Sequence, residues 1–425
     1  MRLFPDSWQI CEINTICSEI VDCVNKTAPV VEEETGYKMI RTTNVRDGRI
    51  DVNETKFVEE SVFKKWTRRV LPRRNDIVLT REAPLGEVGL LRSDEKVFLG
   101  QRTILYRANP RKLNQQFLYY SMLSTYVQGQ IKGQGSGATV EHLRVPDAEK
   151  LAIPVPPLEV QKKIAAILLA YDELIEINQR RIALLEKMAE EIYREWFVRL
   201  RFPGHEQVRK IKGVPEGWCG AELKELASIN PSSISRQGDP ESILYVDISS
   251  VGINRIDDVT PYTSANAPGR ARRRVKHGDV IWSSVRPANR AYCLIYEPPE
   301  NLIVSTGFAV IRPNSATPFT FLFFAVTSNS FIDQMTTVAK GAAYPATSFD
   351  DFEKAKLLVP TECLLRCFHE KTEPMFRQKH FLQQQSEWLR KTRDLLLPRL
   401  ISGKLSVEHL DIQFPPGMGE SVHDI

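Results

Sequence analysis

The sequence predicts an α+β protein in which two mixed α/β globular domains alternate with two long helices that pair as an antiparallel coiled coil. Three observations lead to this prediction. Landmarks of the first half recur in the same order in the second half, a heptad repeat follows each globular part, and short apolar runs between Gly and Pro are typical of strands. At 425 residues the chain is too long for one ordinary core and suits two domains.

The composition is that of a soluble globular protein, with 42% hydrophobic and 26% charged residues. No run approaches the roughly 18 apolar residues of a membrane span, and the N-terminus lacks a secretory signal, so we expect a cytoplasmic protein without membrane contact. The 7 cysteines form no CxxC pair and no zinc-ligand spacing with histidine, so we expect no metal site. The net charge of only +4 means that any nucleic-acid interaction must depend on where the charges lie.

An internal duplication organises the chain. Asp279 follows Asp76 by 203 residues, and the corresponding intervals for Gly100 and Gly307, Thr139 and Thr347, and Pro154 and Pro360 are 207, 208 and 206. Near-constant spacing over most of the chain is the signature of a repeated unit. The five paired landmarks are PDSW 5–8 with PEGW 215–218, NDIVLT 75–80 with GDVIWS 278–283, FLGQRTILYR 98–107 with STGFAVIR 305–312, GQGSGAT 133–139 with GAAYPAT 341–347, and LAIPVP 151–156 with LLVP 357–360.

Each half is predicted to contain a globular part followed by a helix. In the first globular part, strands are expected at 77–79, 88–91 and 103–106 and a helix at 113–128. In the second, strands are expected at 280–283, 292–296 and 308–311 and a helix at 319–337. The predicted domains are the first globular domain at 1–154, the first helix at 155–200, a polar linker at 201–217, the second globular domain at 218–360, the second helix at 361–405 and a tail at 406–425.

The first helix has the apolar seam of a coiled coil. A run of about 40 residues from Pro157 holds no further proline or glycine, and at 1.5 Å per residue it would extend about 60 Å, close to two turns of DNA. The second helix carries a matching seven-residue repeat, so its partner lies in the same chain. The predicted seam comprises Ile164, Leu168, Tyr171, Ile175, Asn178, Ile182, Leu185, Ile192 and Trp196, with Ala189 between the last two turns, and Phe368, Met375, Leu382, Leu389 and Leu396.

Two positions in these helices leave alternatives open. Asn178 is either tolerated polarity or a buried amide that fixes the register of the pair. Pro374 lacks the N–H that an interior helical position needs, so the second helix is either kinked there or begins there.

Basic residues gather directly before the same predicted strand in each half. A single run of charge is more often a solvated loop, but recurrence at equivalent positions favours contact with DNA phosphates. The first cluster is Lys64, Lys65, Arg68, Arg69, Arg73 and Arg74, and the second is Arg270, Arg272, Arg273, Arg274 and Lys276.

Further DNA contacts are expected near strand ends and in two small-residue loops. The loops contain Thr139 and Thr347, and they either bring backbone amides to phosphate or serve as plain turns. Tyr344, in the second loop, either stacks on a base or packs against the protein. The arginines suited to a two-bond contact with guanine are Arg81, Arg102, Arg286 and Arg290.

The residues at 137–175 resemble the junction of recognition domain and conserved helix in the specificity subunits of type I restriction-modification enzymes. The run RDLLLPRLISGKL at 393–405 resembles the end of the second conserved helix in that family. The second junction, at 357–368, departs from the pattern because it lacks the double proline and the glutamine, which leaves the start of the second helix open. The most telling residues are Pro154, Val155, Pro156, Pro157, Gln161, Ile164 and Asp172.

The resemblance implies that each globular part is a target recognition domain that reads one half of a split, asymmetric site in double-stranded DNA. It also implies that the helices set the gap and dock two modification subunits. Adenine methylation from S-adenosylmethionine and cleavage driven by ATP with Mg would belong to those methyltransferase subunits and to restriction subunits. The sequence agrees, since it has no Walker A loop, no GxGxxG after a strand and no Asn/Asp-Pro-Pro-aromatic motif. We therefore expect a non-catalytic chain without a cofactor.

Three other functions explain the sequence less completely. A methyltransferase or nuclease would need a cofactor loop or clustered carboxylates. A two-domain DNA-binding regulator without enzyme partners fits the two basic parts but leaves the long apolar seam unexplained, and a structural coiled coil leaves the duplicated basic parts unexplained. The halves differ too much in their variable parts to read one half-site, which disfavours a palindromic target.

Overall fold

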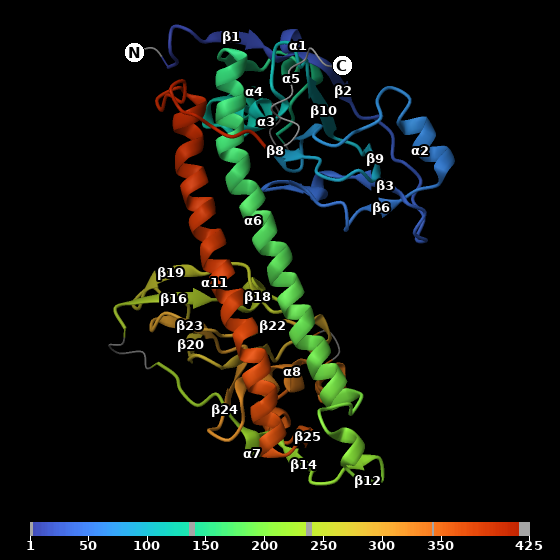
Figure 1. Ribbon diagram of the computed structural model, residues 1–425, viewed down its shortest axis with the longest axis vertical. Helices are drawn as coiled ribbons and strands as arrows, with labels where there is room; N and C mark the ends of the chain where they lie inside the picture. Colours follow the sequence, from blue (N-terminus) through green and yellow to red (C-terminus); the bar gives the residue numbers. More distant parts are fainter. Residues whose placement is uncertain (1–2, 136–140, 235–239, 342–343, 416–425) are drawn as a thin grey trace. The chain divides into compact units, whose positions relative to one another are not determined.

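The computed structural model describes residues 3–135, 141–234, 240–341 and 344–415. The chain divides into two compact units, unit 1 (Met1–Ile177 with Gln385–Ile425) and unit 2 (Asn178–Gln384). Each unit holds one globular part together with a segment of each long helix (Figure 1). Within the described ranges, no helix is long and apolar enough to cross a membrane.

The central sheet of unit 1 has six strands in the order β2-β10-β7-β8-β5-β4. Strand β7 (Ile77–Arg81) pairs antiparallel with both β10 and β8, and its side chains are buried because both faces of the sheet are covered. Helices α3 and α4 contribute Phe117, Leu118 and Val127 to the core beside this sheet. The elements are β1 (Gln9–Glu12), α1 (Ile13–Ile16), β2 (Cys17–Asp22), β4 (Val45–Arg46), β5 (Gly48–Ile50), β7, β8 (Leu85–Leu90), β10 (Thr103–Ala108), α3 (Gln115–Leu123), α4 (Thr125–Gln134), α5 (Val145–Ala148) and β11 (Ala152–Val155).

A smaller sheet of unit 1, with order β6-β3-β9, has no counterpart among the predicted strands. Helix α2 (Glu60–Trp66) packs beside it through Phe63, which meets Phe98 at 6.3 Å between ring centroids. The strands are β3 (Tyr37–Ile40), β6 (Lys56–Phe57) and β9 (Lys96–Leu99), and a 3-10 turn spans Thr42–Asn44.

Unit 2 repeats the central arrangement with strands in the order β15-β24-β21-β22, beside a second sheet β19-β16-β23-β20. Helices α8 and α9 pack on the core around the buried Trp282, whose indole N–H donates to the Val326 carbonyl at 3.1 Å. The elements are β12 (Lys210–Ile211), β13 (Val214–Pro215), β14 (Cys219–Glu222), α7 (Leu223–Leu226), β15 (Ala227–Ile229), β16 (Ser242–Val246), β17 (Val251–Gly252), β18 (Arg255–Ile256), β19 (Thr260–Thr263), β20 (Ala271–Arg274), β21 (Val280–Ser283), β22 (Tyr292–Leu294), β23 (Leu302–Ser305), β24 (Phe308–Pro313), α8 (Phe319–Thr327), α9 (Asn329–Val338), α10 (Phe349–Glu353) and β25 (Lys356–Val359), with 3-10 turns at His205–Gln207, Ile248–Ser250 and Pro287–Asn289.

The duplication corresponds to these elements, but two of the landmark pairs are shifted. The N–H of Leu143 donates to the Arg81 carbonyl, and in unit 2 the N–H of Thr347 donates to the Ser284 carbonyl. Thr347 therefore matches Leu143, and Thr139 lies outside the described residues. By the same reasoning Gly307 matches Arg102 rather than Gly100. The Arg102 carbonyl accepts the N–H of Arg81, and the Gly307 carbonyl accepts the N–H of the equivalent residue Ser284.

The single helix predicted in each globular part is two helices. Residues 113–128 were expected as one helix, but α3 ends at Leu123 and α4 begins at Thr125. In unit 2, α8 ends at Thr327 and α9 begins at Asn329. The reason is the serine between them: Ser124 and Ser328 have extended backbones and accept the N–H three residues later as N-caps. Apolar periodicity continued across both breaks and concealed them.

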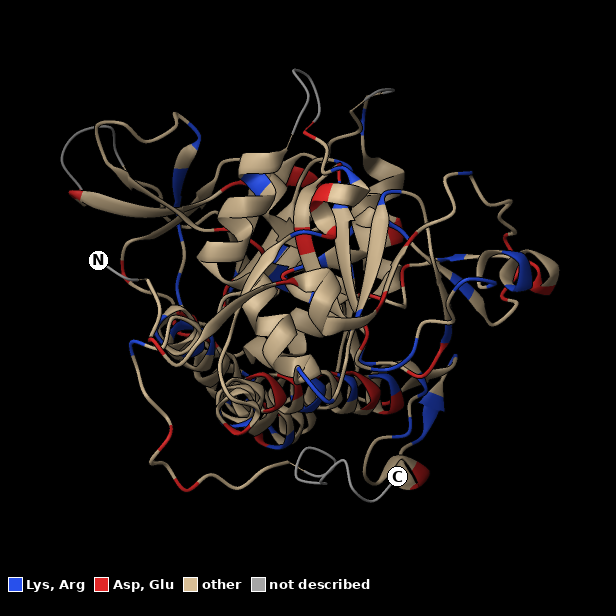
Figure 2. Cartoon of the chain, turned by 90° about the horizontal axis from the view of Figure 1, so that it is seen from above, with Lys and Arg blue, Asp and Glu red and all other residues tan. Residues whose placement is uncertain are grey.

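The long helices are α6 (Leu158–Tyr193), continued by a π-helical turn at Arg194–Val198, and α11 (Glu362–Ile401). Because α11 begins at Glu362 and continues through Pro374, the alternative that it starts at this proline is wrong. All fifteen predicted seam residues are buried or half-buried, and Asn178 is only 4% exposed. Figure 2 shows Lys and Arg interspersed with Asp and Glu along the helices.

Candidate nucleic-acid interface

A buried ion pair anchors the turn that follows the basic cluster in each unit. Arg107 donates from Nε and Nη2 to the Asp76 carboxylate at 2.8 and 2.7 Å, and Arg312 donates in the same way to Asp279 at 2.8 and 2.6 Å. These hydrogen bonds raise the pKa of both arginines. The sequence pattern marked the two aspartates only as equivalent positions of the repeat. It gave no sign of their arginine partners, each of which is the next-to-last residue of the strand that pairs with the strand after the aspartate.

The same carboxylates hold the backbone that leads to the strand. Asp76 accepts the N–H of Arg73, and Asp279 accepts the N–H of Lys276, each at 2.7 Å. The residues that precede the two aspartates, Asn75 and Gly278, share a left-handed backbone with φ of 73° and 84°. Each unit thus holds the end of its basic cluster, Arg73 in unit 1 and Lys276 in unit 2, in a turn of fixed geometry.

The first basic cluster is only partly available to a ligand. Lys64 pairs with Glu60 at 2.9 Å and Arg74 with Asp94 at 3.1 Å, both in exposed pairs that DNA phosphates could replace. Arg69 instead donates from Nη2 to the carbonyls of Asp22 and Cys23, which makes it part of the framework. The remaining members of this cluster, all exposed or half-buried, are Lys65, Arg68 and Arg73.

The second basic cluster was expected to precede the strand at 280–283, and three of its members form a strand of their own. Arg272, Arg273 and Arg274 lie within strand β20, which pairs with β23, and all three are half-buried. Arg273 places its Cζ 5.1 Å from the Phe349 ring centroid, and burial lowers its pKa. The exposed members of the cluster are Arg270 and Lys276. The strand was missed because an unbroken run of arginine carries no apolar alternation.

Two of the predicted DNA contacts lie inside the protein. Arg81 is 8% exposed, and it donates to the Leu143 carbonyl and pairs with Asp22 at 3.0 Å. Thr347 is 4% exposed, and its hydroxyl donates to the Met335 carbonyl at 3.1 Å. In their present positions both hold loops together, and a role in reading DNA would require these bonds to break.

The remaining candidates among the described residues lie at the corresponding corner of each unit, beside the ends of β7 and β21. In unit 1 this corner contains Glu82, which pairs with both Arg102 and His142. In unit 2 the exposed Arg286 and Arg290 flank a 3-10 turn, and the Arg286 Cζ lies 4.6 Å from the ring centroid of Tyr344. The two corners therefore present different chemistry at equivalent places.

A buried hydrogen-bond network in unit 1 gives a structural role to Asp172, one of the residues that carry the family resemblance. Asp172, 3% exposed, accepts hydrogen bonds from Tyr120 at 2.7 Å, Arg393 at 2.5 Å and Arg92 at 3.2 Å. Burial and then the charge of Asp172 raise the pKa of Tyr120, so that the phenol remains a donor. This carboxylate ties α6 to α11 and to the globular part of unit 1.

Gln161 has a comparable role at the start of α6. Its side chain is 1% exposed, accepts the N–H of Asn114 and donates to the carbonyls of Lys112 and Pro156. The glutamine after the proline pair therefore joins the long helix to the turn before α3.

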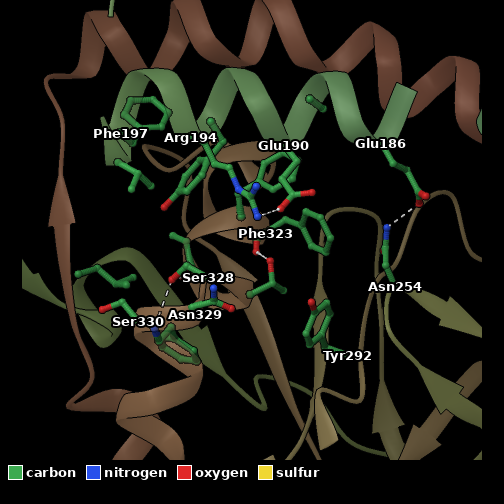
Figure 3. A pocket seen from close by; sticks show the side chains of 18 of the residues that line it. Glu186, Glu190, Arg194, Phe197, Asn254, Tyr292, Phe323, Ser328, Asn329 and Ser330 are labelled. Atoms are coloured by element: carbon green, nitrogen blue, oxygen red, sulfur yellow. Dashed lines mark hydrogen bonds and ion pairs between the residues drawn. The ribbon is translucent and has the colours of Figure 1, made fainter. Parts of the chain in front are cut away.

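A cavity of about 880 Å³ lies in unit 2 between α6, the α8–α9 corner and β22 (Figure 3). Both carboxylates that line it are engaged: Glu186 accepts from Asn254 at 2.8 Å and pairs with Lys379, and Glu190 pairs with Arg194 at 2.6 Å. These pairs give the cavity no carboxylate prepared for acid–base chemistry. Among the described residues, no three His, Cys, Asp or Glu side chains gather to hold a metal ion.

Comparison with known proteins finds similarity to type I restriction-modification specificity subunits in both sequence and fold. The family model for the type I restriction modification DNA specificity domain matches residues 5–187. The type I restriction enzyme MjaIX specificity subunit of Methanocaldococcus jannaschii is 25% identical over 377 residues, covering 83% of this chain and 82% of the relative. The MjaVIII specificity subunit from the same organism is 23% identical over 423 residues, covering 96% and 95%. The crystal structure of the type I restriction-modification S subunit from M. genitalium shares the fold, with a TM-score of 0.59, 18% identity and coverage of 94% of this chain and 98% of the other.

Proposed function

The chain belongs to the family of type I restriction-modification specificity subunits, and we propose from this that it reads a bipartite, asymmetric DNA sequence for a complex whose other subunits carry out the chemistry. The observation that carries the proposal is the duplicated recognition architecture. In each unit a basic cluster leads into a turn that is anchored by an Asp–Arg pair. The relatives are named type I restriction enzyme specificity subunits, which disfavours the alternative of a stand-alone DNA-binding regulator.

The difference between the two corners supports an asymmetric target. Unit 1 presents a carboxylate between Arg102 and His142, whereas unit 2 presents a tyrosine backed by Arg286. Carboxylates accept hydrogen bonds from cytosine amino groups, while aromatic rings make apolar contact with the thymine methyl group. Two such different corners would select different half-sites.

The contacts between α6 and α11 support an antiparallel coiled coil that sets the gap between half-sites. Asp172 contacts Arg393, Glu186 contacts Lys379, and Trp196 meets Phe368 at 5.8 Å between centroids, each within one unit. As α6 advances along this series, the partner residue in α11 steps back by nearly the same number. That is the register of an antiparallel pair.

Exposed apolar side chains on the same helices support docking of modification subunits. In unit 1, Trp388 and Leu395 are 71% and 72% exposed and stand seven residues apart, on one side of α11. In unit 2, Leu184 and Met188 are 59% and 52% exposed and stand four apart on α6. Exposed apolar side chains that share one side of a helix favour protein contacts, and their presence in both units fits two modification subunits.

Under this proposal S-adenosylmethionine binds the modification subunits, and ATP with Mg serves the restriction subunits. The test is methyl transfer from labelled S-adenosylmethionine to a library of duplexes. The chain alone should transfer no methyl group, the modification subunits alone should show no sequence preference, and the mixture should methylate one bipartite asymmetric sequence. Methylation by the rigorously purified chain, or a palindromic target of the mixture, would contradict the proposal.

A further inference from the structure

We propose, resting on the DNA-reading function above, that Tyr344 is a specificity-determining residue of unit 2 whose ring packs on a base of the second half-site, with Arg286 as its positioning residue. The first observation is exposure: Tyr344 is 70% exposed, which places its ring outside the core clusters of the unit. The base faces of a duplex are covered by stacked neighbours, but an aromatic ring this exposed offers apolar surface that can contact a base edge, such as the thymine methyl group in the major groove.

The segment around Tyr344 is held in place by its neighbours. The N–H of Arg286 donates to the Pro345 carbonyl at 2.7 Å, and Ala346 forms antiparallel bridges with both Val285 and Lys340. The N–H of Thr347 then donates to the Ser284 carbonyl at 2.8 Å. The tyrosine is therefore presented by a fixed backbone, as a base-reading side chain must be.

The arginine behind the ring leaves one face for a ligand. The Arg286 Cζ lies 4.6 Å from the Tyr344 centroid, a cation–π contact that fixes the orientation of the ring. The same segment meets the second basic cluster, because Arg273 of β20 stands over Phe349. Tyr344 therefore lies on a segment that also contacts Arg273, a member of the cluster expected to contact DNA phosphates.

Unit 1 supplies an internal comparison. Ala83 and Arg286 occupy the same place after their strands, both precede a proline, and both have a left-handed backbone with φ of 49° and 50°. A side chain in this conformation is held by its surroundings rather than by preference. The left-handed residue before the proline is therefore common to both units, whereas an arginine at that place is particular to unit 2.

The test uses the complex of the full chain with its modification subunits and selects bound sequences from a random duplex library. Tyr344→Ala should lose the preference at one or two adjacent base pairs of one half-site and weaken cognate binding about tenfold to hundredfold. Tyr344→Phe should retain the preference because the ring remains. Arg286→Gln should weaken the preference at the same base pairs, and Val259→Ala, at a residue 39% exposed elsewhere in unit 2, should change nothing.

The slope of log affinity against log salt separates this role from phosphate contact, and it should be unchanged in Tyr344→Ala. A wild-type profile in Tyr344→Ala would overturn the inference while leaving the proposed function intact. Equal weakening on all sequences would also overturn it. If the wild-type complex itself showed no sequence preference, the proposed function would be the part that fails.

Discussion

At the scale of single residues, the lysines and arginines predicted to contact DNA divide into side chains that build the domain and side chains that are available to DNA. Arg69 and Arg81 donate to carbonyls of the framework, whereas Arg270 and Lys276 are exposed. Clustering of charge could be predicted from the sequence because it is local. Which guanidinium groups are occupied depends on carbonyls far along the chain, such as that of Leu143 for Arg81.

Replacing Arg272, Arg273 and Arg274 with alanine should weaken binding of the assembled complex to cognate and scrambled duplexes alike. Removal of one phosphate contact lowers the slope of log affinity against log salt by about 0.9. Since Arg273 stands over Phe349 and Arg272 donates to the Gly269 carbonyl, we expect a flattening smaller than the roughly 2.7 that three phosphate contacts would give. A selective loss on the cognate duplex with an unchanged slope would identify these arginines as base readers.

The Asp279–Arg312 pair should be a stability determinant of unit 2. Asp279→Ala leaves the partly exposed Arg312 without its carboxylate and should lower the free energy of unfolding by about 3 kcal/mol. Asp257→Ala, which removes an exposed pair with Arg255, should cost less than about 1 kcal/mol. Urea unfolding of both variants and of the Asp279→Ala/Arg312→Ala double variant measures the coupling. Additive losses would show that the pair does not act as a unit.

At the scale of elements, the long helices could be read from the heptad pattern, whereas the breaks in shorter helices could not. The seam residues from Ile164 to Leu396 all lie away from solvent to some degree, because a seven-residue apolar repeat requires a partner. Ser124 and Ser328 interrupt their helices with a single side-chain hydrogen bond each, and nothing in the apolar pattern signals that. Strand β20 could not be predicted for a related reason. Its arginines show no apolar alternation, and only the pairing with β23 makes this segment a strand.

Deleting 180–183 from α6 together with the residues opposite them in the inferred register, 382–385 of α11, should shorten the tolerated gap between half-sites. Four residues are about one turn, or 6 Å, of each helix. The preferred bases of each half-site should stay the same, because both globular parts are left intact. Sequence selection with the reconstituted complex measures both. Deletion in α6 alone is the control and should impair assembly, since it shifts one side of the seam past the other.

At the scale of the whole molecule, the exposed apolar side chains are expected to be covered only in the complex. The double variant Trp388→Ala/Leu395→Ala should weaken association with a modification subunit by at least tenfold while leaving the melting temperature of the free chain nearly unchanged, because both side chains are more than 70% exposed. Sedimentation or titration calorimetry would measure this. Glu387→Ala, at an exposed residue on another side of the same turn of α11, is the matched control. Unchanged association of the double variant would place the docking surface elsewhere.

The sequence by itself determined the duplication, the mixed α/β character, the two long helices and the family, because repeats, periodicity and motifs are properties of neighbouring residues. The tertiary structure alone decided how the landmarks correspond. Thr347 matches Leu143 because their backbone N–H groups donate to equivalent carbonyls, those of Ser284 and Arg81. It also decided which polar residues are structural: Asp172 meets Arg393 across 221 residues of chain. Contacts of that separation depend on the packing of the folded chain, and no local pattern encodes them.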